Sequence, residues 1–216
     1  ATIRFYNDAS NNIVRYTTIK GAGTANLASV IVFYNLNTSK ILANNIIDHN
    51  NITSVSDNTR PYNAIYSVGN TATYPNVNIT ISNNNIYNFF HPAITSNGIF
   101  VDSFNDSWSI KGNSFYETTN FAPSSNGTYS AINISNIYGV NNHTITGNFI
   151  GGSAPNAGGS PWVKTNANDN IFQAININAA SGTQQGNIHS NTITNFDYSN
   201  SLNAPFYGIK ISAGAY

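Results

Sequence analysis

The sequence has no cysteine and no methionine, and charged residues make up only 7% of its 216 positions. Without cysteine there is no disulfide framework and no thiol chemistry. Eight basic and eight acidic side chains leave a formal net charge of zero. Because nucleic acids and anionic membrane surfaces are bound through basic patches, this balance argues against both partners. No apolar run approaches the roughly 20 residues of a membrane-spanning helix, so we expect no membrane insertion.

Amphipathic helices are also missing, because no run has apolar residues at the helical spacing of three and four. The chain instead repeats a six-residue pattern: apolar, polar, small, Asn, any residue, apolar. The copies occupy residues 41–46, 81–86, 110–115, 145–150 and 188–193, with a rougher copy at 14–19. Such internal repetition is typical of repeat architectures.

A second pattern precedes each copy and consists of a small residue followed by alternating β-branched apolar residues. It occupies residues 64–68, 98–102, 131–135, 174–178 and 208–212, and more loosely 29–33. Alternation with a period of two indicates a strand. The segments start 35, 34, 33, 43 and 34 residues apart. A unit of this size that holds only short strands predicts one coil of a β-solenoid.

The repeated Asn has a structural explanation, because Asn tolerates the left-handed backbone of a tight corner and its amide bonds to backbone groups. Stacked at the strand spacing of ~4.8 Å, these amides are expected to form a hydrogen-bonded ladder. The predicted ladder consists of Asn44, Asn84, Asn113, Asn148 and Asn191. The neighbouring Ile81, Ile110, Ile145 and Ile188 are expected to form an internal apolar stack.

Over residues 28–212 the two patterns together resemble the right-handed parallel β-helix of the pectin-lyase-like superfamily. The resemblance implies an all-β, right-handed parallel β-helix of about six coils, each with three short strands. We interpret residues 1–216 as a single β-helix segment in which 1–27 form a degenerate first coil and 28–212 the regular coils. The chain opens on Ala1 and stops part-way through a coil, so we expect it to be truncated at both ends and to pack against neighbouring β-helix coils of the same parent chain.

In the enzymes of this superfamily the substrate cleft lies on the outer face of the first strand. The residues predicted to point outward there form two columns: Ile31, Tyr66, Phe100, Asn133, Asn176 and Lys210, and Phe33, Val68, Asp102, Ser135, Asn178 and Ser212. A calcium-dependent lyase or a glycosidase needs several carboxylates close together. This face offers Asp102 alone, so the sequence assigns no catalytic residue, no metal ligand and no cofactor.

The same face is a candidate glycan-binding surface. Tyr66 and Phe100 are consecutive aromatic members of one column, and the amides of Asn133 and Asn176 beyond them would bond sugar hydroxyls. Asp102 lies alongside, and Trp162 sits in the longest loop, residues 151–173. Arg60 is a weaker candidate. The alternative is that apolar loops at 89–92, 121–123 and 161–163 fold over the aromatic residues and bury them.

These patterns are compatible with two functions. The first is a non-catalytic structural or adhesive segment of a large secreted or cell-surface protein that contacts polysaccharide or cell-surface glycan. The alternative is a polysaccharide-active enzyme, a lyase or a glycoside hydrolase, whose catalytic residues lie partly outside this chain. The Asn-rich, Lys-poor composition resembles secreted surface proteins of gliding and polysaccharide-degrading bacteria, so we expect a bacterial, secreted or surface location.

Overall fold

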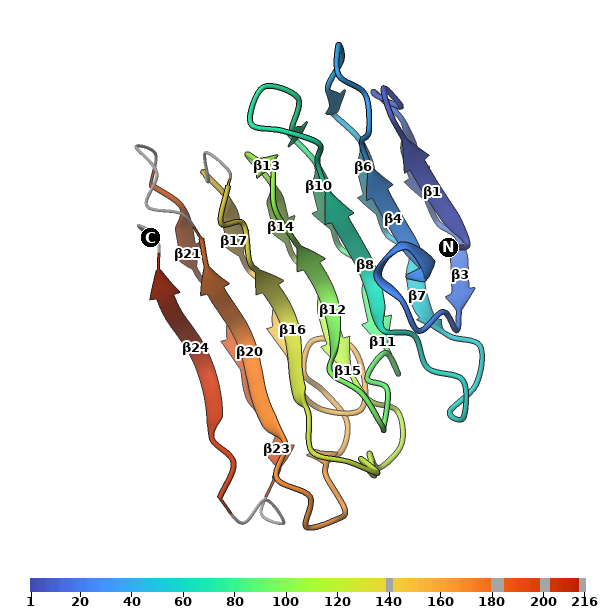
Figure 1. Cartoon of the computed structure of the whole chain (residues 1–216). Helices are drawn as coiled ribbons and strands as arrows, with labels where there is room; N and C mark the ends of the chain where they lie inside the picture. The colour runs from blue at the N-terminus through green and yellow to red at the C-terminus, as the bar shows by residue number, and fades with distance from the viewer. Residues whose placement is uncertain (139–141, 180–184, 199–202, 214–216) are drawn as a thin grey trace.

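A computed structural model describes residues 1–138, 142–179, 185–198 and 203–213 of the chain. These residues form short strands and one 3-10 turn, η1 (Asn26–Ala28). Strands of successive coils lie side by side from β1 (Ile3–Tyr6) at one end to β24 (Phe206–Ala213) at the other (Figure 1). Every pairing between the strands is parallel. The molecule is therefore an all-β, right-handed parallel β-helix, as predicted.

Three long sheets run along the solenoid, one for each strand position in the coil. The first-strand sheet consists of β1, β4 (Ile31–Tyr34), β8 (Asn63–Val68), β12 (Ser96–Val101), β16 (Thr128–Ile134), β20 (Ile171–Asn178) and β24. The second-strand sheet consists of β2 (Ile13–Arg15), β6 (Ile46–Asp48), β10 (Thr80–Ser82), β14 (Ser109–Lys111), β17 (Thr144–Thr146) and β21 (Asn187–His189). The third-strand sheet consists of β3 (Thr18–Gly21), β7 (Asn51–Ser54), β11 (Asn85–Tyr87), β15 (Ser114–Tyr116), β18 (Phe149–Ile150) and β22 (Thr192–Ile193).

Two small sheets, which the sequence patterns did not predict, extend the coils. One joins β5 (Leu42–Ala43), β9 (Asn76–Val77) and β13 (Asn105–Asp106) at the corner before the second strand. The other pairs β19 (Trp162–Val163) with β23 (Phe196–Asp197). Part of the long 151–173 loop is therefore a β-strand that pairs with the following coil.

The interior consists of columns of aliphatic side chains, one from each coil. Ile31, Ile65, Ile99, Ile132 and Ile175 follow one another in register and are fully buried. Ile47, Ile81, Ile110 and Ile145 form an equivalent column in the second-strand sheet. Because one coil cannot bury its own apolar face, each coil is stabilised by its two neighbours. Residues 1–27, predicted to be degenerate, supply β1, β2 and β3 in register with the second coil.

The asparagine ladder is present, but one predicted member is wrong. From Asn50 onward, the backbone N–H and side-chain Nδ2 of each Asn donate to Oδ1 of the next, through Asn84, Asn113, Asn148 and Asn191. Thr17 begins the ladder by donating its N–H to Asn50 Oδ1. Asn44 instead occupies an earlier corner with a positive φ of 58°, where it bonds Asn11 and Asn78 at the surface.

The predicted outward columns are also wrong in the second coil and at their last position, where Asn178 pairs with Ala213 and not with Ser212. Ile31 pairs with Ile65 and Phe33 with Ser67, so Ile31 and Phe33 point inward. The outward members are Val32, which pairs with Tyr66, and Tyr34, which pairs with Val68. The outward column of the first-strand sheet is therefore Arg4, Val32, Tyr66, Phe100, Asn133, Asn176 and Lys210.

Candidate functional site

Three of the predicted glycan-binding residues lie in one partly exposed row on the outer face of the first-strand sheet. Phe100, Asn133 and Asn176 are register partners on β12, β16 and β20. A chain of amide hydrogen bonds holds the two asparagines: Asn176 Nδ2 donates to Asn133 Oδ1 at 2.9 Å, and Asn133 Nδ2 donates to Asn97 Oδ1 at 3.1 Å. We call Phe100, Asn133 and Asn176 the outer row.

Tyr66 does not share that exposure. Its side chain lies next to Phe100, with ring centroids 5.4 Å apart, but η1 packs over β8 and leaves Tyr66 only 4% exposed. Its hydroxyl donates to Asp102 Oδ2 at 2.8 Å. Burial and this hydrogen bond raise the pKa of Tyr66. Tyr66 therefore supports the outer row from beneath η1, and its ring face is not open to a sugar.

Asp102 lies at the end of β12 and is partly exposed, but its carboxylate is already bonded. Oδ2 accepts the Tyr66 hydroxyl, and Oδ1 accepts the backbone N–H and the hydroxyl of Ser103 at 2.7 and 3.2 Å. This arrangement fixes the turn that follows the strand. Asp102 is positioned as a turn residue at the rim of the outer row.

Trp162 is fully buried, which contradicts its predicted role as a surface sugar contact. It lies in an interior cluster of aromatic rings with Phe89, Phe90 and Phe172, at centroid distances of 5.3–6.1 Å. The apolar loop segments at 89–92, 121–123 and 161–163 place their rings in the interior of the solenoid and not, as the alternative interpretation had expected, over Tyr66 and Phe100. Phe121 and Tyr129 complete the same cluster.

Arg60, the weaker sugar candidate, is buried as well. It forms an ion pair with the fully buried Glu117 and a second one, at 3.0 Å, with the exposed Asp57. Its guanidinium lies 5.6 Å from the centre of the Phe121 ring. A hollow of about 250 Å³, lined in part by Arg60 and Phe121, opens beside the pair. This pair ties together the loops that follow β7 and β15, two coils apart with β11 between them.

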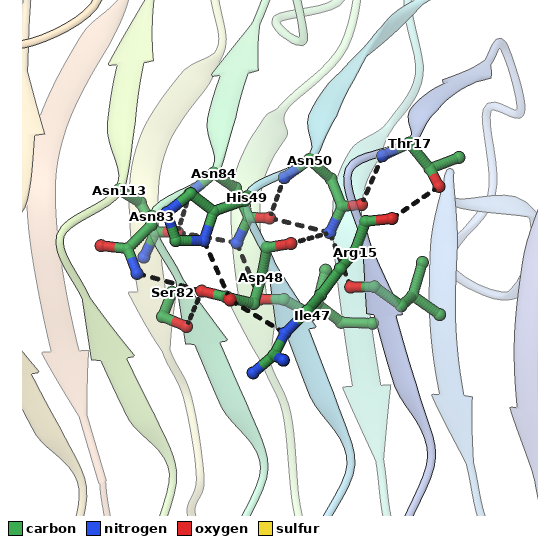
Figure 2. Close-up of polar contacts among 11 residues, drawn as sticks. Arg15, Thr17, Ile47, Asp48, His49, Asn50, Ser82, Asn83, Asn84 and Asn113 are labelled. Atoms are coloured by element: carbon green, nitrogen blue, oxygen red, sulfur yellow. Dashed lines mark hydrogen bonds and ion pairs between the residues drawn. The ribbon is translucent and has the colours of Figure 1, made fainter.

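The second-strand sheet carries a polar cluster around Asp48 that the sequence patterns did not identify. Figure 2 shows Arg15, His49, Ser82 and Asn83 converging on the Asp48 carboxylate. Arg15 Nε and His49 Nδ1 lie 3.0 and 2.9 Å from Oδ2. Ser82 Oγ and Asn83 Nδ2 donate to Oδ1 at 2.6 and 3.0 Å. The cluster joins three successive coils beside the asparagine ladder.

The environment of Asp48 favours its charged form. Burial acts to raise the pKa of this carboxyl, but hydrogen bonds from Ser82, His49 and Asn83 outweigh it and lower the pKa to about 2. The carboxylate thus stays ionised across the physiological range. The partners of Asp48 come from three successive coils, so the cluster holds these coils in register.

We expect Asp48→Asn to lower the free energy of unfolding by about 2 kcal/mol at pH 7, with the difference from the native protein vanishing near pH 2. The folded-state pKa lies below the unfolded value, so the contribution is present above about pH 4 and is lost as the pH falls toward 2. Urea unfolding at pH 7, 4 and 2.5 measures it.

The matched control for this variant is Asp8→Asn. Asp8 also pairs with a cation, Lys40 at 2.9 Å, but both side chains are well exposed. Exposed pairs contribute little, so this variant should unfold like the native protein at each pH. A loss in Asp48→Asn that persists unchanged at pH 2.5 would contradict the electrostatic explanation.

A correct alignment of the second coil would have revealed the Asp48 cluster. With Asn50 as the ladder residue, Asp48 lies two positions before it, as Arg15 does before Thr17 and Ser82 before Asn84. The three residues are in register on neighbouring strands, so the six-residue pattern could have shown that they meet. The buried pair of Arg60 and Glu117 has no such signal, since the two residues are 57 positions apart.

Within the ranges that the structure describes, no group of three or more His, Asp or Glu side chains is arranged to hold a metal ion. In the same ranges no helix has the length and apolar character to cross a membrane. No protein-family model, curated protein or solved structure matches the chain.

Proposed function

We propose that the chain is a stiff β-helix segment of a secreted or cell-surface bacterial protein that contacts glycans through the outer row. Its arrangement is that expected of the pectin-lyase-like superfamily. The observation that carries the proposal is the continuity of the ladder and the aliphatic columns through every coil, from Thr17 to Asn191 and from Ile31 to Ile175. A solenoid held this way is a rod with repeating outer faces.

The outer row suits a neutral sugar better than a charged ligand. Phe100 offers a partly exposed aromatic ring that suits stacking on a sugar ring. The two amides beside it would bond sugar hydroxyls through their N–H groups, because Asn176 Oδ1 is buried and Asn133 Oδ1 accepts from Asn176. The amides of Asn133 and Asn176 are oriented by their neighbours, so little side-chain freedom would be lost on binding. Asp102 and Lys210 at the rim add one charge of each sign.

The test is binding of the chain to a panel of immobilised bacterial, algal and plant polysaccharides. We expect at least one polysaccharide to retain the chain, and both Phe100→Ala and the double variant Asn133→Ala/Asn176→Ala to weaken binding at least tenfold. Tyr138→Ala is the matched control, because Tyr138 is an exposed aromatic residue that stacks on Phe104 at a different corner. Thermal unfolding shows whether each variant is folded.

Three results would overturn the glycan assignment. One is that no immobilised polysaccharide retains the folded chain. Another is that Tyr138→Ala weakens binding as much as Phe100→Ala does. The third is release of shortened or unsaturated sugars from a retained polysaccharide, which would favour the enzyme alternative.

A further inference from the structure

The hollow beside Arg60 lies in the middle of the solenoid, with described coils on both sides of it. It forms where the loops after three consecutive third strands meet: residues 55–62 after β7, 88–95 after β11 and 117–127 after β15. Its volume is about 250 Å³. We call it the Arg60 hollow.

Arg60 is a buried cation that keeps free hydrogen-bond donors. Its side chain is 4% exposed. Nη1 donates to Glu117 Oε2 and to the Phe90 carbonyl at 3.4 Å, and Nη2 donates to Asp57 Oδ1 at 3.0 Å. Nε and the second N–H of Nη2 have no hydrogen-bond partner among the described residues. Because Arg60 lines the hollow, these are the donors that it offers to a ligand there.

Glu117 holds the guanidinium of Arg60 in place from within the protein. Its side chain is 0% exposed. Burying an ion pair costs desolvation free energy, and two apolar side chains of similar volume are often as stable, so stability alone does not explain the pair. What the pair provides is a guanidinium whose orientation is set before a ligand arrives. A binding group held by such a buried partner loses little freedom when it binds.

Asp57 supplies a hydrogen-bond acceptor next to these donors. Its side chain lines the hollow and is 55% exposed. Oδ1 accepts from Arg60, while Oδ2 has no partner among the described residues. Two adjacent hydroxyls on one ring match this arrangement, since one O–H donates to the carboxylate and the neighbouring oxygen accepts from the guanidinium. The two carboxylates around Arg60 offset its charge, so the hollow favours a neutral ligand over an anion.

The rest of the lining combines apolar and polar groups. The apolar part consists of Pro92, Phe121 and Ala122, and the polar part of Asn58, Thr119 and Asn120. Small-molecule sites have this mixed character, with typical volumes of roughly 300–1,000 Å³. At about 250 Å³ the Arg60 hollow is smaller, so it suits a ligand of one ring rather than a stretch of several.

We propose that the Arg60 hollow binds a single neutral sugar residue, at the end or on a branch of a glycan. Asp57 and Arg60 bond two adjacent hydroxyls of the ring, and the apolar part of the lining contacts its C–H groups. This site is separate from the outer row, and it rests on the proposed function only for the class of ligand. It gives the chain a means of recognising a glycan terminus or branch, which a row on an open sheet face does not select.

The experiment is an NMR titration of the full chain with methyl glycosides that follows the Nε–H signal of Arg60. The neutral glycosides are those of glucose, galactose, mannose, xylose, fucose and N-acetylglucosamine, and the glycoside of glucuronic acid is the charged counterpart. Asp57→Ala removes the acceptor and leaves the pair of Arg60 with Glu117 in place. Its matched control is Asp8→Ala, which removes a carboxylate from another ion pair, with Lys40. Thermal unfolding shows whether each variant is folded.

We expect at least one neutral glycoside to shift the Arg60 signal until it saturates, and Asp57→Ala to raise its Kd about tenfold. Asp8→Ala and Phe100→Ala should bind it like the native chain. The proposal is overturned if no neutral glycoside shifts the Arg60 signal, if only the acidic glycoside does, or if Asp57→Ala binds as tightly as the native chain. Polysaccharide retention that depends on Phe100 tests the outer row alone, so either site can fail without the other.

Discussion

Replacing Arg60 by Met is expected to lower the free energy of unfolding by about 3–5 kcal/mol at pH 8.5, and by clearly less at pH 5. The Arg60 side chain is 4% exposed and its partner Glu117 is fully buried. Removing the guanidinium leaves the Glu117 carboxyl in an apolar corner without a cation. A buried, unpaired charge is among the few single changes that cost this much.

The pH dependence follows from the protonation of Glu117. Burial raises the pKa of this carboxyl to about 7, although the charge and hydrogen bond of Arg60 act to lower it. The folded state therefore binds this proton more tightly than the unfolded chain does. That contribution to stability is fully present below the unfolded pKa of about 4.5 and is lost as the pH rises through 7. Without Arg60 the carboxyl must either remain protonated or be buried as an anion, so the cost grows with pH.

Two further variants distinguish the electrostatic contribution of Arg60 to the free energy of unfolding from its packing contribution. Glu117→Gln keeps the shape of the side chain and an oxygen that accepts from Arg60, so it should flatten the change in stability between pH 5 and 8.5. Arg60→Met/Glu117→Gln should itself be equally stable at both pH values, because no ionisable group remains in the pair. Urea unfolding at each pH measures all three proteins. If Arg60→Met alone costs equally at pH 5 and 8.5, packing rather than charge explains the loss.

The fold was predictable because the coil repeats signals that act over a few residues. Alternation within residues 98–102 and 131–135 predicted the positions of the strands, and the interval between the two segments predicted the length of one coil. The prediction of which strand residues point inward failed where the alternation disappears. Val30, Ile31, Val32 and Phe33 are consecutive apolar residues and are all fully buried, because η1 packs over the outward Val32. A pattern with a period of two cannot choose a face in such a run.

The misplaced ladder residue has a different cause. Residues 41–46 and 47–52 each fit the six-residue pattern at all positions but one, Leu42 in the first and His49 in the second, and both carry an Asn near a corner. Asn44 occupies a left-handed position at the surface, whereas Asn50 is buried between coils. Local sequence specifies that a corner needs Asn, but only the stacking of neighbouring coils decides which amide is enclosed.

The candidate sites depended even more on long-range packing. Tyr66 and Trp162 were plausible sugar contacts by residue type, and both are buried by segments distant in sequence. Tyr66 lies beneath η1, which comes before β4, and Trp162 joins rings from other loops and strands. What covers an aromatic residue on a solenoid is set by its loops, and the loops do not repeat.

Replacing Asn113 by Ala, in the middle of the ladder, is expected to lower the free energy of unfolding by about 3–5 kcal/mol. Asn113 Oδ1 accepts from the N–H and Nδ2 of Asn84 at 3.0 and 2.9 Å. Its Nδ2 donates to the Ile81 carbonyl at 2.9 Å and to Asn148 Oδ1 at 3.0 Å. The substitution leaves several buried polar groups without partners, and each such group costs about 1–3 kcal/mol.

The loss of stability depends on whether the amide belongs to the buried ladder, and an Asn at a surface corner should contribute little. Asn44→Gly removes an amide of the same kind from a surface corner, and Gly adopts its positive φ without strain, so we expect a change within about 0.5 kcal/mol. Asn191→Ala should cost about half as much as Asn113→Ala, because Asn191 has a ladder neighbour on one side only within the described chain. Denaturant unfolding of the three variants tests this order. Equal losses at Asn44 and Asn113 would mean that the ladder adds nothing beyond the usual contribution of a corner asparagine.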